Sequence, residues 1–201
     1  MHLHLALDQF WRIAELRHVA AKEGTLATVH LHLDPDDELV ATATNSMLLA
    51  QWRLEAEYDS FVLDDPVLLS AAALGEAIGA LQSMVKIDRG KFDPVGWTAR
   101  LTSDGGDVAV AAFDPFGERR GDIMVPVFNG DYPKYERLFD TKPKGLDSVG
   151  VSPKQLVALA KTTTDPDRRL SLVFRGDQAS VVRAFAEKHW RGLASPIKES
   201  E

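Results

Sequence analysis

The sequence predicts an α+β fold made of three similar units, each with the order strand, helix and then two or three further strands. Stretches that alternate apolar and polar residues, as half-buried strands do, flank stretches that carry apolar residues at helical spacing. Such a βαβββ unit has one apolar sheet face and one apolar helix stripe, so neighbouring units must join edge to edge to bury both. We therefore expect helices on one face of the molecule and continuous antiparallel sheets on the other.

The first unit begins with the alternating residues 1–5, which predict a strand. A helix is expected over residues 6–21, where apolar residues such as Phe10 and Ile13 recur at helical spacing. An Asp-Pro-Asp-Asp turn at residues 34–37 separates the first two of the three strands that come next. These strands are expected at residues 25–33, 39–44 and 48–57.

The second unit repeats this order and contains the best hairpin signal of the chain. In the turn at residues 103–107, Gly105 and Gly106 permit the positive φ that tight turns require. A helix rich in alanine and leucine is predicted over residues 70–84. The strands of this unit are expected at residues 61–63, 97–102, 108–113 and 122–128.

A Tyr-Pro-x-Tyr segment within residues 130–139 forms the junction to the third unit, and its proline favours an extended backbone. The third unit is expected to have a helix at residues 153–163, because Pro153 is tolerated in a first helical turn. Its strands are expected at residues 148–151, 170–174, 180–185 and 190–197. The predicted domains are therefore residues 1–140, with two units, and residues 141–201, with one. An odd unit leaves an edge strand without a neighbour, which favours oligomerisation.

The composition fits an intracellular protein with a substantial core. The 201 residues are 45% hydrophobic and include no cysteine, which excludes disulfides and thiolate metal sites. No stretch approaches the roughly 18 apolar residues of a membrane span, and the amino terminus does not read as a signal peptide. We therefore expect a cytoplasmic protein without a membrane partner. A net charge of −7 argues against a surface covered with phosphate-binding residues.

Three segments carry patterns of a known family: residues 43–50 (ATNSMLLA), 130–139 (GDYPKYERLF) and 190–198 (WRGLASPIK). They resemble segments of the bacterial DNA polymerase III β subunit, the sliding clamp. Residues 43–50 match a family segment of the form Ala-Thr-Asp-Gly-His-Arg-Leu-Ala, and residues 130–139 match the family's Gly-x-Phe/Tyr-Pro-Asp-Tyr segment. Residues 190–198 (WRGLASPIK) resemble the family's carboxyl-terminal strand, which ends in a Met-Pro-Met/Val-Arg pattern. The three matches occur in the family's order. The chain is similar to a shortened clamp, because a full subunit has six units and this chain has three.

The chain departs from the family pattern in the first and the last of these three segments. Asn45, Ser46, Met47 and Leu48 replace the Asp-Gly-His-Arg portion, so a histidine and an arginine are missing. The sequence Ser-Pro-Ile at residues 195–197 replaces Met-Pro-Met. The resemblance therefore does not carry over the family's usual specificity for partners.

The resemblance implies a non-enzymatic DNA polymerase processivity factor without a cofactor, which encircles duplex DNA and holds polymerase and clamp-loader peptides in a hydrophobic pocket. A full clamp ring has twelve such units. Because this chain has three, the resemblance favours a ring of four chains. The pocket residues that the resemblance implies are Thr44, Leu48, Leu49, Pro133, Leu138, Val151, Leu193, Pro196 and Ile197. The cations expected to face DNA are Arg12, Arg17, Lys22, Lys86, Arg89, Lys91, Lys154 and Lys161.

Several alternatives stay open at this stage. The pocket residues also suit an ordinary core between domains, and the cations also suit solvated helix faces. A clamp-derived adaptor would keep the peptide pocket without encircling DNA. A metal-dependent enzyme would use the alternating histidines His2, His4, His30 and His32. The aspartates Asp34, Asp36, Asp37, Asp104 and Asp107 fall in predicted turns, where aspartate is favoured by its local hydrogen bonds.

Overall fold

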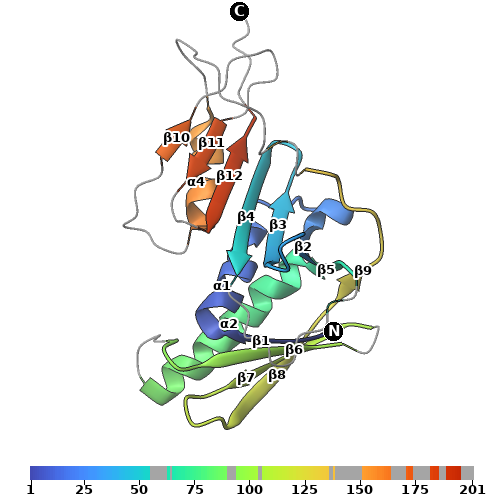
Figure 1. Cartoon of the computed structure of the whole chain (residues 1–201). Coiled ribbons are helices and arrows are strands. Elements are labelled where there is room, and N and C mark those ends of the chain that lie inside the picture. The colour runs from blue at the N-terminus through green and yellow to red at the C-terminus, as the bar shows by residue number, and fades with distance from the viewer. Residues whose placement is uncertain are drawn as a thin grey trace, which may run out of the picture.

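Two antiparallel sheets form the framework of the protein in the computed structural model (Figure 1). The structure describes residues 1–54, 63, 65–89, 94–103, 106–135, 138, 151–163, 171–173, 182–185 and 189–195. In residues 86–89, 171–173 and 182–185 only the backbone is described. Within these residues, one sheet has four strands in the order β1-β6-β7-β8, and the other has eight in the order β10-β11-β12-β4-β3-β2-β5-β9.

The helical segments are α1 (Leu7–Glu15), the 3₁₀ turns η1 (Leu16–His18) and η2 (Thr25–Ala27), α2 (Ala71–Arg89) and α4 (Pro153–Lys161). The strands are β1 (His2–Ala6), β2 (Thr28–Leu33), β3 (Leu39–Thr44), β4 (Leu48–Leu54), β5 (Val67–Ser70), β6 (Thr98–Thr102), β7 (Val108–Phe113), β8 (Arg119–Val125), β9 (Val127–Phe128), β10 (Ser171–Val173), β11 (Val182–Phe185) and β12 (Trp190–Ala194). The predicted mixture of helices and antiparallel sheets is confirmed.

The first two units exchange their first strands. Strand β1 of the first unit pairs with β6 in the sheet of the second unit, and β5 of the second unit pairs with β2 in the sheet of the first. Helices α1 and α2 pack against each other and against strands of both sheets. One buried core, which includes Leu3, Phe10 and Leu101, therefore serves both units, and neither unit is closed by itself.

The third unit continues the sheet of the first unit. Strand β12 pairs antiparallel with β4, and the register places Trp190 opposite Trp52 and Leu193 opposite Leu49. Figure 1 shows β10, β11 and β12 beside β4, with α4 behind them. The continuous sheet expected from stacked units is thus present across this boundary, which we call the seam.

A turn recurs in both of the first two units. The sequence Asp-Pro-Asp-Asp-Glu at residues 34–38 joins β2 to β3, and Asp-Pro-Phe-Gly-Glu at residues 114–118 joins β7 to β8. Asp34 accepts hydrogen bonds from the backbone N–H groups two and four residues on, and Asp114 does the same. Each aspartate also pairs with an arginine, Arg53 or Arg120. These carboxylates therefore stabilise turns, which is the structural role that aspartate often has in such sequences.

Several predicted boundaries differ from the observed ones. The strand predicted at residues 61–63 is wrong at Leu63, which lies outside any strand, and residues 61–62 fall outside the described part. The strand before α2 is β5, and Ser70, predicted as the first helical residue, instead caps the helix by accepting a hydrogen bond from Ala73 N at 3.3 Å. Helix α1 is shorter than predicted because the chain tightens into the 3₁₀ turn η1.

In the third unit, α4 begins at Pro153 as predicted. Its first turn is fixed by a capping box, in which Ser152 Oγ accepts from Lys154 N and Gln155 Oε1 accepts from Ser152 N. Val151 lies in no strand, and residues 148–150 of the strand predicted there are outside the described part, as are residues 196–197 at the end of the last predicted strand. No described helix has the length and apolar character needed to cross a membrane.

Candidate binding pocket

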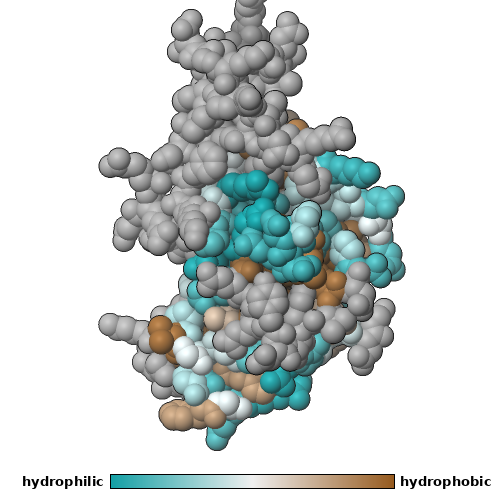
Figure 2. Space-filling model, in the orientation of Figure 1, coloured by the Kyte–Doolittle hydropathy of each residue, from teal (hydrophilic) through white to brown (hydrophobic). Residues whose placement is uncertain are grey.

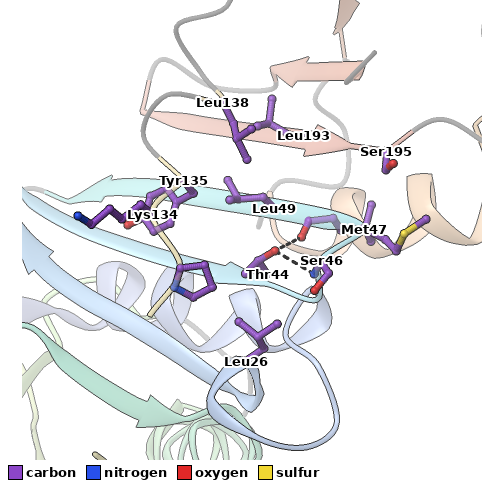
Figure 3. Close-up of a pocket in the computed structure, with 12 residues that line it drawn as sticks. Leu26, Thr44, Ser46, Met47, Leu49, Lys134, Tyr135, Leu138, Leu193 and Ser195 are labelled. Atoms are coloured by element: carbon purple, nitrogen blue, oxygen red, sulfur yellow. Dashed lines mark hydrogen bonds between the residues drawn. The ribbon is translucent and has the colours of Figure 1, made fainter. Parts of the chain in front are cut away.

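A row of three side chains at the seam forms the floor of a pocket. Thr44 of β3 lies opposite Leu49 of β4, and Leu49 lies opposite Leu193 of β12. All three are buried, and they alternate with Ala43, Ala50 and other residues that belong to the helix-facing core. The pocket therefore lies on the sheet face away from the helices, where the first unit meets the third (Figure 3).

The turn between β3 and β4 forms the rim. Thr44 Oγ1 donates to Leu48 O at 2.6 Å, and Asn45 Oδ1 accepts from the backbone N–H groups of Met47 and Leu48. Ser46 adopts a φ of 72°, an uncommon conformation for a residue with a side chain. The turn is therefore held in one shape, with Met47 half exposed at its tip.

The junction segment forms the opposite wall. Pro133, Lys134, Tyr135 and Leu138 all line the pocket. The Tyr135 ring is buried and packs with Leu49 and Leu193 in a small apolar cluster that is separate from the main core. Leu138 N donates to Tyr135 O at 2.9 Å, which continues the wall past the tyrosine.

Four aromatic side chains fasten this wall to the sheet. His30 of β2 stacks between His32 and Tyr132, with ring centroids 4.7 Å apart in both pairs. The Tyr135 hydroxyl lies 3.3 Å from His30 Nδ1 and 3.5 Å from His32 Nδ1. A hydroxyl placed this way donates to one neutral imidazole and accepts from the Nδ1–H of the other. We call these four residues the His–Tyr cluster.

Burial keeps two members of the His–Tyr cluster, His30 and Tyr132, uncharged at neutral pH. Desolvation, with a smaller effect from His32, lowers the pKa of His30 to about 4, and desolvation also raises the pKa of Tyr132 well above its usual range. Protonation of His30 would place a charge in a site that disfavours it.

We expect the protein to lose about 1–2 kcal/mol of unfolding free energy between pH 7.5 and pH 5 because of His30, after allowance for its partial exposure. The unfolded chain binds a proton at His30 near pH 6.5, whereas the folded protein does so only near pH 4. Stability from this residue is therefore full above pH 6.5 and declines as the pH falls. Urea unfolding at the two pH values measures the change. His30→Phe should flatten the dependence, and an equally steep profile in that variant would contradict the assignment.

The pocket has a volume of about 320 Å³ and is lined by six of the nine residues that the sequence suggested: Thr44, Leu48, Leu49, Pro133, Leu138 and Leu193. Val151 does not line it and packs against the main core instead. Pro196 and Ile197 lie outside the described residues.

Six further residues line the pocket, namely Leu26, Ser46, Met47, Lys134, Tyr135 and Ser195. All but Leu26 fall in the three segments that carried the resemblance, so a closer reading of those segments could have included them. Leu26 comes from the 3₁₀ turn η2, and nothing in its sequence surroundings signalled this position.

A second cavity of about 710 Å³ adjoins the first, because Met47 and Leu48 line both. Its other lining residues come from the end of η1 and the loop after it, from the β3–β4 turn, and from the cap and first part of α4. They are His18, Ala20, Ala21, Lys22, Asn45, Ser152, Lys154, Gln155 and Ala158. The two cavities therefore meet at the turn between β3 and β4. On the face shown in Figure 2, the hydrophobic residues among those coloured form separate small areas.

The cations expected to face DNA lie in different surroundings. Arg12 pairs with Asp8 at 3.4 Å and covers the Trp52 ring, and Arg17 pairs with Glu15 at 2.7 Å. Lys22 and Lys154 are exposed and line the second cavity, and Lys161 is exposed at the end of α4. The side chains of Lys86 and Arg89 at the end of α2, and residue Lys91, are not among those described.

The four alternating histidines do not come together. His2 and His4 lie on β1 in the four-stranded sheet, whereas His30 and His32 lie on β2 in the eight-stranded sheet. In the described part of the chain, no three His, Cys, Asp or Glu side chains are grouped so that they could hold a metal ion.

Comparison with solved structures identifies the architecture. A sliding clamp of Pseudomonas aeruginosa, solved with a ligand, is 13% identical with a TM-score of 0.63, and the match covers 100% of this chain and 66% of that one. The DNA polymerase III β subunit of Thermotoga maritima is 8% identical with a TM-score of 0.62, covering 100% and 65%. The β clamp of Helicobacter pylori, solved bound to a DNA ligase peptide, is 11% identical with a TM-score of 0.59, covering 100% and 68%.

No protein-family model matches the sequence, and no curated protein matches it either. The resemblance noted in the sequence is confirmed at the level of the fold, which extends over the whole chain. The chain therefore has the fold of the bacterial DNA polymerase III β sliding clamps and spans about two thirds of the length of these structures.

Proposed function

We propose that the protein is a sliding-clamp-like DNA polymerase processivity factor that binds partner peptides in the seam pocket. The observation that supports this most is the pocket itself, whose apolar floor spans two units and whose wall is a segment fixed by the His–Tyr cluster. The clamp of Helicobacter pylori, which has the same fold, was solved with a DNA ligase peptide. Polymerase and clamp-loader peptides are the partners that we propose here.

The pocket suits an extended peptide with apolar anchors. Leu49 and Leu193 form an aliphatic floor with Leu138 beside them (Figure 3). Pro133 also lines the pocket. An aliphatic or aromatic side chain entering this space leaves water without losing a hydrogen bond. A cavity of about 320 Å³ holds one or two such side chains. The second cavity accepts the residues beside them.

The proposed action is topological and involves no chemical step by this protein. A ring around duplex DNA keeps any polymerase bound in the pocket close to the template, which raises its effective concentration there. Contact with DNA needs only loose attraction to the backbone, because a sliding ring must not read sequence. This role places the protein in the cytoplasm.

A ring requires several copies of this chain. Within the described residues, β8 and β10 each pair with one neighbour only, so each presents a free strand edge. We propose that the chain assembles as a homo-oligomer through such edges. Four chains of three units would give the twelve units of a full ring. The domain division at residue 140 belongs to the same proposal.

Retention on DNA circles tests the ring. We expect the assembled protein to stay on circular plasmid DNA through gel filtration and to leave when the plasmid is linearised, because a ring slides off a free end. Light scattering should show an oligomer. Equal retention on circular and linear DNA, or a monomer at all concentrations, would overturn the proposal of a ring.

The same experiment distinguishes the ring from a second candidate function, a clamp-derived adaptor that binds peptides without encircling DNA. The engaged side chains of Arg12 and Arg17, which reduce the free positive charge on α1 and the η1 turn that follows it, favour this second function. An adaptor would bind peptides as a monomer and would show no preference for circles.

A further inference from the structure

The charges around the two cavities differ from those of the whole chain. The sequence has 30 acidic and 23 basic residues. Yet among the described residues, neither cavity is lined by an aspartate or a glutamate. Lys134 lines the first cavity, and Lys22, Lys154 and His18 line the second. A route with positive charge therefore crosses the surface of an acidic protein.

The second cavity is lined by two exposed lysines, Lys22 and Lys154. Among the described residues, Lys22 and Lys154 form no ion pair, in contrast to Arg12 and Arg17. The adjacent acid, Glu23, does not line the cavity. Lys154 lies in the first turn of α4, which contains no acidic residue and whose N–H groups add partial positive charge.

His18 contributes little to this charge at neutral pH. Its Nε2 lies 3.0 Å from Glu15 Oε2, but burial outweighs this partner and lowers the pKa of His18. The surroundings of the cavity thus combine two lysines, which form no ion pair with any described residue, with the polar groups of Asn45, Ser152 and Gln155. These groups suit a carboxylate better than a neutral or a basic side chain.

We propose that the second cavity selects partner peptides that carry Asp or Glu beside the apolar residues that occupy the first. This selection rests on the proposed peptide-binding function and adds the partner's charge to it. One peptide reaches both cavities because Met47 and Leu48 belong to both. The apolar anchors supply most of the affinity, and the carboxylates determine which segment binds.

Two labelled ten-residue peptides test the selection by fluorescence anisotropy. Both contain the same leucine and phenylalanine anchors, and one has two aspartates where the other has two asparagines. The pair of peptides is made in two versions. In one version the two aspartates or asparagines precede the anchors, and in the other they follow them. In one of the two placements, the aspartate peptide should bind about tenfold more tightly at low salt. The difference should shrink at about 0.5 M salt because ions screen exposed charges.

A double variant shows whether the two lysines are responsible. Lys22→Gln with Lys154→Gln should remove the preference, so that the aspartate and asparagine peptides bind this variant with equal affinity. Lys161→Gln is the matched control. Lys161 is exposed on α4, the helix that also carries Lys154, but it lines neither cavity. Equal binding of the two peptides in both placements would overturn the charge selection and leave the peptide pocket standing. If no peptide binds, both proposals fail.

Discussion

Trp52→Ala is expected to destabilise the protein by about 3–5 kcal/mol, the range for removing a fully buried aromatic side chain. Trp52 is 0% exposed and lies opposite Trp190 at the seam. Its Nε1 donates to Thr162 O at 2.8 Å, and Trp190 Nε1 donates to Thr162 Oγ1 at 3.1 Å. The substitution opens a cavity and also leaves the Thr162 carbonyl, at the end of α4, without this donor.

Chemical denaturation followed by circular dichroism measures this loss. Trp52→Phe keeps most of the ring but not the N–H group, so it should cost about 1–3 kcal/mol and separate the hydrogen bond from the packing. Phe116→Ala is the control, because Phe116 is 87% exposed and its loss should change stability by less than about 0.5 kcal/mol. A loss below 1 kcal/mol for Trp52→Ala would show that the seam does not unfold with the core.

The sequence predicted strands best where the local pattern alone determines them. Strands β3 and β7 have the predicted bounds. Each is preceded by a turn sequence with aspartate or glycine, which marks in the sequence where the strand begins. Strand β5 was missed because its four residues Val67–Ser70 alternate too little to be recognised. Only pairing with β2 and β9 makes them a strand. Pairing between distant segments leaves no local signal in the sequence. The exchange of β1 and β5 between the first two units could therefore not be predicted either.

The site was predictable where neighbouring residues form it. Thr44 and Leu49 lie at opposite ends of one turn, and Pro133 and Leu138 lie in one segment, so matching short segments placed them together. The role of His30 and His32 was not predictable in this way. They are about a hundred residues from Tyr135 in sequence, and only the folded sheet brings the Tyr135 hydroxyl between them. Lys22 and Lys154 also lie far apart along the chain, which is why their shared cavity was not foreseen.

Leu138→Asp is expected to weaken peptide binding at least about a hundredfold, because the carboxylate would lose its hydration when an apolar anchor fills the pocket. Leu138 is 45% exposed, so the free protein should fold with an aspartate there. Leu49→Asp should abolish binding as well, but Leu49 is 4% exposed in the floor and the charge would also unfold the sheet around it. Leu138 is therefore the better position for the test.

Two companion variants make the result specific. Leu138→Asn is polar but uncharged, so it separates the loss of apolar contact from repulsion of an acidic peptide. Val157→Asp is the matched control, since Val157 is 55% exposed on α4 and lines neither cavity. Isothermal titration with the aspartate peptide should show near-normal binding for Val157→Asp and a clear loss for both Leu138 variants. Undiminished affinity in a folded Leu138→Asp protein would place the peptide elsewhere, because a ligand seated on Leu49 and Leu193 contacts residue 138 at the wall above them.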